Sequence, residues 1–426
     1  MKTSLITAYA VNPYHGSEDG TGWNISRQVA TEHKTIIVTR KNNRPEIERY
    51  MAEVNDPVHA NMQFMYYDLP NWAMFWKKMI GPRGYVLYYY LWQLFMPLFI
   101  IKNNLKFDIA HACNFHSDSH PNFLWLFGKP TVWGPIGHHP KMPHEYIKHH
   151  GSAVVNTDRK YAAVKWILRT LDPFFHLAVW KSDAIIGINS SVQKVIRADK
   201  KKMSIIPAVA SVKPKATAVS NEKKFQVLSV GRFTPMKGFD ITVKAFAKFY
   251  RQLPVADRAN VKMKLVGKGE DEQMLLDLIF ENGLEKAVEM VNWVELSEMP
   301  QIYADSNLYM FPSHEGAGMV VPEAMSYGLP VVCFDNVGPG ELIGEFGIKI
   351  PYKDYETSVS DYANAITDLY FDPAKAKQLS DEGKIEFDRK FTWETKGQQI
   401  RQIYRRLLNP TMVSAPVFFS PETVEA

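Results

Sequence analysis

The chain has 426 residues, of which 46% are hydrophobic and 22% charged, an ordinary globular composition that excludes a wholly disordered or collagen-like chain. At about 100–200 residues per domain, this length predicts two or three domains. The net charge of +5 is uneven, because residues 1–215 carry 27 Lys and Arg against 15 Asp and Glu, and the remainder carries 23 against 30. Two halves of opposite charge indicate domains with different partners.

The N-terminal segment and the cysteines indicate the cellular compartment. The apolar run after Lys2 is cut at Asn12 and Pro13, so we expect no signal peptide. Cys113 and Cys333 are far apart in sequence and form neither a zinc pattern nor a disulfide framework, which fits a reducing compartment. We therefore expect a cytoplasmic protein, with association at the cytoplasmic face of a membrane left open.

Strand-like and helix-like segments alternate through the first half, which is typical of parallel α/β domains. A strand over 3–10 precedes a loop over 11–22 that is rich in Gly, Ser and Asp, and a helix over 23–33 follows. Further strands are predicted at 35–39, 63–67, 108–113, 130–133, 183–188 and 204–206, with a helix at 46–53.

One segment of the first half has the length of a membrane helix. Gly84 to Ile101 contains 18 residues without a charge, which reaches the transmembrane threshold. Gln93, Pro97 and several tyrosines weaken that interpretation. A buried or half-buried helix is favoured, a membrane-surface element is the main alternative, and a true span is the least favoured.

Residues 208–224 are small, polar and basic and form the best linker candidate. Strands are then predicted at 225–230, 261–266, 287–291, 308–311 and 330–334, with helices at 239–250, 271–281, 361–369, 373–386 and 392–408. We expect domains over 1–207 and 225–391, a helix over 392–410 that packs back on the first domain, and a loose tail over 411–426. Two such α/β domains predict a cleft between the carboxyl ends of their sheets.

The second half carries two segments with chemistry. In the first, a predicted strand ends at Gly231, and the following loop holds Arg232 and Lys237 before Gly238. Two cations at a strand-to-helix turn suit an anion such as a diphosphate. Two solvated loop cations are the alternative.

The second segment runs from Phe311 through a glycine-containing loop into a short helix. Backbone N–H groups at this helix start can hold phosphate oxygens, and Gly316 and Gly318 allow close approach of the backbone. The carboxylates of Glu315 and Glu323 can accept paired hydrogen bonds from sugar hydroxyls. Alternatively, Glu315 caps the helix and Glu323 faces solvent.

Together these segments resemble retaining glycosyltransferases of family 4, which have the GT-B fold of two Rossmann-like domains with parallel sheets facing a central cleft. The likeness rests on Gly231-Arg232 with Lys237-Gly238, on Glu315 and Glu323 eight positions apart, and on the VPEAMSYGLPVV stretch that includes Glu323. It extends to the loop at 15–23 and to WGPIG at 133–137, which are similar to those of a polysaccharide-biosynthesis subgroup.

The resemblance implies a role for each candidate. Arg232 and Lys237 would hold the donor diphosphate, Glu323 the ribose and Glu315 the transferred sugar. Gly16 would lie in a loop that closes over the diphosphate, with Gly316 among the donor-binding residues. Gly318, Met319 and Val320 would give backbone contacts to phosphate and sugar. His111 is similar to a histidine near the transferred sugar, and a satisfied histidine at a strand end is the alternative.

Three departures from the family pattern concern specificity: Asp19 stands in place of proline, Ala317 in place of an aromatic residue, and Gly137-His138-His139-Pro140 in place of a glycine-rich run. The loop histidines His138, His139, His144, His149 and His150 lack ordered ligand spacing, so we expect solvated side chains and no metal site. No Asp-x-Asp pair occurs, and we expect no required metal or cofactor.

We therefore predict a retaining, metal-independent hexosyltransferase that moves a sugar from a nucleotide-diphosphate sugar to a glycan or lipid-linked acceptor in cell-surface or exopolysaccharide synthesis. The first domain would bind the acceptor and the second the donor. A non-catalytic nucleotide-sugar-binding protein and a GT-B nucleotide-sugar epimerase are the alternatives. The basic first half, with Trp72, Phe75, Trp76, Lys77 and Lys78, predicts peripheral contact with an anionic membrane. Nucleic acid is not expected as a partner.

Overall fold

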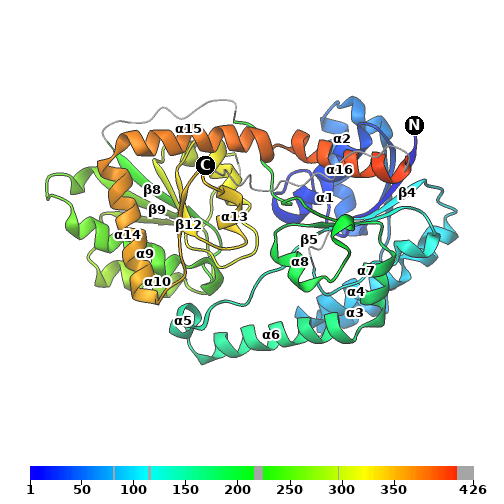
Figure 1. Cartoon of the computed structure of the whole chain (residues 1–426), viewed down its shortest axis with the longest axis horizontal. Helices are drawn as coiled ribbons and strands as arrows, with labels where there is room; N and C mark the ends of the chain where they lie inside the picture. Colours follow the sequence, from blue (N-terminus) through cyan, green and yellow to red (C-terminus); the bar gives the residue numbers. More distant parts are fainter. Residues whose placement is uncertain (80–81, 114–116, 215–223, 296, 410–426) are drawn as a thin grey trace, which may run out of the picture. The chain divides into compact units, whose positions relative to one another are not determined.

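The structure is a computed structural model that describes residues 1–79, 82–113, 117–214, 224–295 and 297–409. The chain forms two compact units. The first comprises Met1–His138, Ala163–Ala208 and the segment from Trp393 onward, and the second comprises His139–Ala162 and Val209–Thr392 (Figure 1). Most of the predicted linker, residues 215–223, and the predicted loose tail lie outside the described residues.

A seven-stranded parallel sheet forms the centre of the first unit, in the order β3-β2-β1-β4-β5-β6-β7. The chain order reverses between β1 and β4, which makes the carboxyl ends of these two strands the topological switch point. The strands are β1 (Thr3–Thr7), β2 (Lys34–Thr39), β3 (Met62–Tyr66), β4 (Ile109–Ala112), β5 (Thr131–Ile136), β6 (Ala184–Gly187) and β7 (Met203–Ile205).

Helices cover this sheet. They are α1 (Ser17–Ala30), α2 (Arg44–Glu53), α3 (Asn71–Met79), α4 (Pro82–Lys102), α7 (Pro173–Lys181), α8 (Ser191–Val195) and α16 (Trp393–Leu408), while α6 (Ser152–Leu171) has residues in both units. Helix α16 packs on α1, where the Arg401 guanidinium donates to Gln28 O at 2.8 Å and the Arg405 guanidinium pairs with Glu32. These contacts attach the end of the described chain to its first helix.

Helix α4 contains the long uncharged segment and divides it between two environments. Tyr88, Trp92 and Met96 recur every four residues and are buried in the core, whereas Leu87 and Leu98 are more than half exposed. Among the described helices, α4 is long and apolar enough over Gly84–Lys102 to cross a membrane, by length and composition only. The buried face fits a core helix, and the exposed apolar face keeps the membrane-surface interpretation open.

The second unit has a six-stranded parallel sheet in the order β10-β9-β8-β11-β12-β13. Its switch point lies between β8 and β11. The strands are β8 (Phe225–Val230), β9 (Val261–Val266), β10 (Val288–Val291), β11 (Leu308–Phe311), β12 (Val331–Phe334) and β13 (Ile348–Ile350). The helices are α5 (His144–Ile147), α9 (Phe239–Gln252), α10 (Glu272–Glu281), α11 (Met299–Ala304), α12 (Val320–Ser326), α13 (Pro339–Ile343), α14 (Tyr355–Phe371) and α15 (Pro373–Lys390).

Successive strand residues of this sheet enter opposite cores, as the two-residue period of a strand requires. Leu308 and Met310 pack in one cluster with residues of α9, α10 and α14, whereas Tyr309 and Phe311 pack in another with residues of α12. Both faces are covered, which explains why these strands read as continuous apolar runs.

Short 3-10 helices complete both units: η1 (Lys41–Asn43), η2 (Pro57–Asn61), η3 (Leu124–Phe127), η4 (Lys148–His150), η5 (Lys200–Lys202), η6 (Pro235–Lys237) and η7 (Arg258–Asn260). The prediction of one continuous domain over 1–207 differs from the structure, because His139–Ala162 groups with the second unit. The physical reason is Tyr146, a buried residue of that unit's core whose hydroxyl donates to Lys353 O at 2.9 Å.

Replacement by alanine should destabilise the protein to different extents at two glycines, Gly238 in the turn between β8 and α9 and Gly283 after α10. Gly238 has φ +66° and a Cβ there would lie 2.2 Å from Pro312 O, whereas Gly283 has φ +64° with no atom within 4 Å of that Cβ position. We expect Gly283→Ala to lower the free energy of unfolding by about 1 kcal/mol, the cost of left-handed backbone. Gly238→Ala should lower it by roughly 3 kcal/mol, because backbone must also move.

Urea unfolding of both variants measures this difference. Equal losses for the two variants would contradict the account, since the backbone conformation is shared and only the contact with Pro312 differs.

Candidate functional site

The two predicted donor segments leave neighbouring strands of the second sheet. Strand β8 pairs with β11 through Val227 with Leu308 and Leu228 with Tyr309. Since both strands run in the same direction, the loops after them emerge at the same edge, at the switch point where α/β sheets bind ligands. The loops also touch, because Met236 O accepts a hydrogen bond from His314 N at 2.8 Å.

An ion pair joins two of the predicted site residues. Lys237 Nζ lies 2.7 Å from Glu315 Oε1, and the two side chains are 14% and 12% exposed. Lys237 Nζ also lies 5.0 Å from the centre of the Phe311 ring. A lysine ammonium has three donors and a carboxylate has about four acceptor sites, so both groups keep capacity for a ligand. Glu315 therefore pairs across the loops, and α12 has no side-chain cap.

Arg232 lies on the same loop as Lys237 and is exposed. Within the described ranges, no acidic side chain forms an ion pair with Arg232. A guanidinium presents five donors in a planar fork that matches phosphate oxygens. The loop after β8 thus carries one cation held by a carboxylate and a second that faces solvent.

The rest of the donor loop is closely packed. Gly316 and Gly318 are buried, while Met319 and Val320 are half-buried and pack against the core around Phe311. These four residues lie on one continuous segment with Glu315, as their sequence order requires.

Glu323 is half-buried on α12. Its Oε2 accepts a hydrogen bond from Tyr303 Oη at 2.8 Å. Burial raises the pKa of Glu323, and the hydrogen bond from Tyr303 offsets part of that rise. The alternative of a solvent-facing Glu323 does not agree with this geometry. Tyr303 itself had no sequence signal, because only folding brings α11 beside α12.

Gly16 lies at the switch point of the first sheet. It is exposed and immediately precedes α1, and the loop around it is tight, since a Cβ at Gly20 would lie 2.4 Å from His15 O. Burial and the neighbouring Asp19 raise the pKa of Glu18 to about 7. Perturbed carboxyl groups are frequent at functional sites, which makes Glu18 a candidate that the sequence reasoning missed. Its only sequence signal was its place in the glycine loop.

His111 is fully buried in β4. Its Nδ1 lies 2.9 Å from Tyr404 Oη, and its Nε2 lies 2.6 Å from Gly134 O. Burial lowers the pKa of His111 to about 4, although the contact with Gly134 opposes that shift. In this structure both ring nitrogens have protein partners, which favours the alternative of a satisfied strand-end histidine over a sugar contact.

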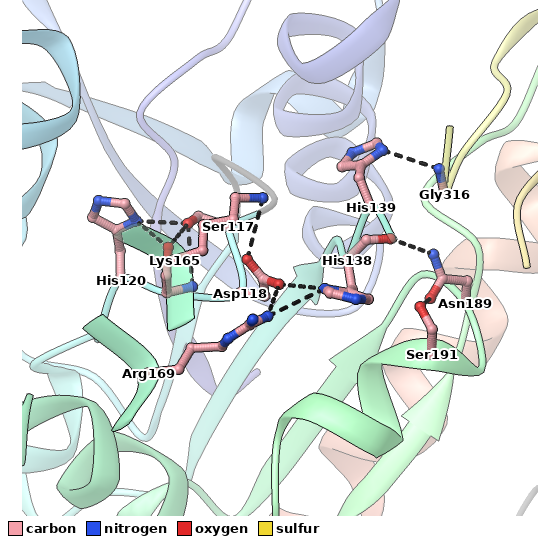
Figure 2. Close-up of polar contacts among 11 residues, drawn as sticks. Ser117, Asp118, His120, His138, His139, Lys165, Arg169, Asn189, Ser191 and Gly316 are labelled. Atoms are coloured by element: carbon pink, nitrogen blue, oxygen red, sulfur yellow. Dashed lines mark hydrogen bonds and ion pairs between the residues drawn. The ribbon is translucent and has the colours of Figure 1, made fainter. Parts of the chain in front are cut away.

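The prediction of solvated histidines after β5 was wrong for His138, which belongs to a buried network (Figure 2). Its Nδ1 lies 2.5 Å from Asp118 Oδ2, and Asp118 also pairs with Arg169 at 2.6 Å and Lys165 at 3.4 Å. Although burial opposes the shift, the His138 hydrogen bond and the two cations lower the pKa of Asp118 to about 2. The network attaches α6 to the carboxyl end of the first sheet.

The prediction was also wrong for two histidines of the second unit, His139, which is half-buried, and His150, whose side chain is 4% exposed. Gly316 N donates to His139 Nδ1 at 3.0 Å, and His150 lies beside Asp240 and Asp271. Sequence spacing could not find these contacts, because their partners come from distant loops and helices. Over the described ranges, no group of three or more His, Cys, Asp or Glu is arranged to hold a metal ion.

Comparisons with known proteins agree with the sequence motifs. Residues 213–386 match the family described as Glycosyl transferases group 1. An uncharacterized glycosyltransferase of Haemophilus influenzae is 32% identical over 41% of this chain and 47% of its own length. The O-antigen chain mannosyltransferase B of Escherichia coli is 25% identical over 42% and 45%. The chain thus spans about half the length of these relatives.

A solved structure extends the likeness to both units. Anabaena Alr3699/HepE, determined in complex with UDP, has a TM-score of 0.59 and 16% identity over 95% of this chain and 99% of its own. At this identity the likeness shows the fold alone. The GT-B fold predicted from the motifs is confirmed, as is the resemblance to GT-B glycosyltransferases.

The raised pKa of Glu323 predicts how its replacement changes stability. A carboxyl whose pKa is higher in the folded state is more costly to ionise there, so its ionisation reduces stability as the pH rises above the unfolded value of about 4.3. We expect Glu323→Gln to unfold at a higher temperature than the native chain at pH 8. The difference should shrink toward zero at pH 4.

Thermal unfolding between pH 4 and pH 8 measures this difference. As a control, Tyr303→Phe removes the hydrogen bond that lowers the pKa of Glu323, so it should widen the pH dependence. A constant difference between Glu323→Gln and the native chain at every pH would contradict the account.

Proposed function

We propose that this chain transfers a sugar from a nucleotide-diphosphate sugar to a glycan or lipid-linked acceptor. Its residues 213–386 match the Glycosyl transferases group 1 family, and its fold is GT-B. The proposed setting is the synthesis of a cell-surface or exopolysaccharide. A relative named as an O-antigen chain mannosyltransferase and a fold neighbour determined with UDP support this proposal.

The observation that carries the proposal is the pairing of Lys237 with Glu315 at the switch point of the second sheet. A cation and a carboxylate at 2.7 Å suit a ligand with an anionic part and a hydroxyl-rich part. Arg232 adds a solvent-facing guanidinium on the same loop. A diphosphate joined to a sugar has both parts, and the half-buried carboxyl of Glu323 on α12 suits the ribose.

In the proposed reaction, the bond between the anomeric carbon and the diphosphate oxygen breaks as the bond to the acceptor oxygen forms. Lys237 and Arg232 stabilise the charge that develops on the leaving diphosphate, which is usually the largest catalytic contribution. The acceptor proton passes to the leaving phosphate oxygen. Attack on the same face retains the anomeric configuration, and these protein cations do the work of a metal.

Glu315 binds sugar hydroxyls in this proposal and forms no covalent intermediate. Its ion pair with Lys237 holds it as a partner for hydroxyl groups. Isolation of a glycosyl adduct on Glu315 would contradict this assignment.

Two alternatives remain separable by experiment. A nucleotide-sugar epimerase would turn over its donor without any acceptor. A non-catalytic protein would bind the donor without turnover. The paired geometry of Lys237 and Glu315 supports an intact site, so the transferase is favoured.

The donor site predicts a specific loss on replacement of Lys237. We expect the native chain to bind and slowly hydrolyse one of the UDP-, GDP- or ADP-sugar series, with EDTA having no effect. Lys237→Met should lower kcat/KM by about 100-fold or more, because the developing phosphate charge loses its buried cation. A nucleotide-sugar panel with kinetic assays measures both effects.

The control is Lys377→Met on α15, which breaks an exposed pair with Asp381 at 2.6 Å within one helix. We expect it to keep native kcat/KM. Equal activity of Lys237→Met and the native chain would contradict the donor assignment, and loss of activity on EDTA treatment would contradict metal independence.

We also propose that the first unit contacts an anionic membrane from the cytoplasmic side. Trp72 and Phe75 on α3 are each 61% exposed, and Trp166 and Leu171 on α6 are 60% and 70% exposed. None of the residues of α6 is buried. These apolar side chains belong to a half of the chain with a large excess of basic residues, which suits an anionic surface. The side chains of residues 76–78 lie outside the described part.

Vesicle sedimentation tests the membrane contact. We expect the native chain to sediment with anionic vesicles at low salt and less with neutral ones. Trp166→Glu with Leu171→Glu should weaken this binding several-fold, whereas Phe280→Glu with Trp293→Glu, at equally exposed positions of the second unit, should not. Absence of binding to anionic vesicles at low salt would contradict the proposal.

A further inference from the structure

The segment from His139 to Gly151 is attached to the second unit at three places. In its middle, Tyr146 is buried, and its hydroxyl lies 2.9 Å from Lys353 O and 2.7 Å from Ser358 Oγ. The Tyr146 ring packs 5.0 Å from the ring of His314 and 5.2 Å from that of Phe334. This side chain joins the segment to the end of β12 and to the loop that carries Glu315.

The second attachment is His150, whose side chain is only 4% exposed. Its Nδ1 lies 3.4 Å from Asp271 Oδ1 and its Nε2 lies 3.8 Å from Asp240 Oδ2. Asp240 is itself fixed by a hydrogen bond of 2.6 Å from Tyr355 Oη. The end of the segment is therefore bound to the starts of α9 and α10.

The third attachment reaches the donor loop. His139 Nδ1 accepts a hydrogen bond from Gly316 N at 3.0 Å (Figure 2). An imidazole nitrogen that accepts a hydrogen bond carries no proton, so the neutral ring has its proton on Nε2. Gly316 follows Glu315 directly, and the hydrogen bond thus fixes the backbone next to the carboxylate that pairs with Lys237. Gly316 is a residue with little conformational restriction of its own.

We infer that His139 is a positioning residue for the donor loop, which acts through Gly316 to hold Glu315 in place for the nucleotide-sugar. This inference rests on the proposed function and adds a residue to its site. The position belongs to the run Gly137-His138-His139-Pro140, where the sequence departs from a glycine-rich pattern. A glycine at this position would offer no side-chain acceptor, so the histidine gives this chain its own constraint on the loop.

Two nearly isosteric replacements test the inference. Asparagine presents an amide oxygen that can accept from Gly316 N, whereas leucine has a similar size and no acceptor. We expect His139→Leu to raise KM for the nucleotide sugar by about fivefold, as the loss of one hydrogen bond implies, with a smaller change in kcat. His139→Asn should restore most of the native KM. His144→Leu, at an exposed position of the same segment, should leave KM unchanged.

A second measurement separates failure of this inference from failure of the proposed function. Hydrogen–deuterium exchange of the peptide that contains Gly316 requires no substrate. We expect faster exchange there in His139→Leu and native exchange in His139→Asn. If the native chain binds no nucleotide sugar but exchange behaves in this way, the positioning contact stands and the proposed function fails. Equal exchange in His139→Leu and His139→Asn, or equal KM values for His139→Leu and the native chain, would overturn the inference.

Discussion

The parallel pairing of β11 with β8 is the constraint on which the candidate site depends. Because the chain order of the second sheet reverses at this pair, the loops after the two strands share one edge. That arrangement brings Lys237 and Glu315, which are 78 positions apart, to 2.7 Å. The core clusters on both faces of the sheet hold the strands that support this ion pair, so packing and proposed chemistry share the same framework.

Much of the fold follows from the sequence because strands buried on both faces are continuous apolar runs. The predicted bounds of β8, β9 and β11 agree with the structure at both ends. The segment over 139–162 was assigned to the wrong unit, because its attachment depends on Tyr146 and His150, whose partners come from distant elements. No periodicity within the segment could reveal those contacts.

The candidate site also contains residues that the sequence identified and residues that only the structure revealed. Motif order identified Lys237 and Glu315, since both lie on loops that follow recognisable strands. Tyr303, which donates to Glu323, carried no pattern, and His139 was expected in solvent. His111 was selected by resemblance, yet its ring contacts Tyr404 from the last helix, which no local sequence signal connects to β4. Contacts between side chains of different helices, strands and loops therefore could not be predicted from the sequence and required the structure.

The most direct test of the central claim is a crystal structure of the protein with the nucleoside diphosphate that it binds best. The account predicts diphosphate oxygens within hydrogen-bond distance of Lys237 Nζ and the Arg232 guanidinium, with the ribose hydroxyls on Glu323. A diphosphate bound elsewhere, with the pair between Lys237 and Glu315 undisturbed and untouched by ligand, would contradict the claim.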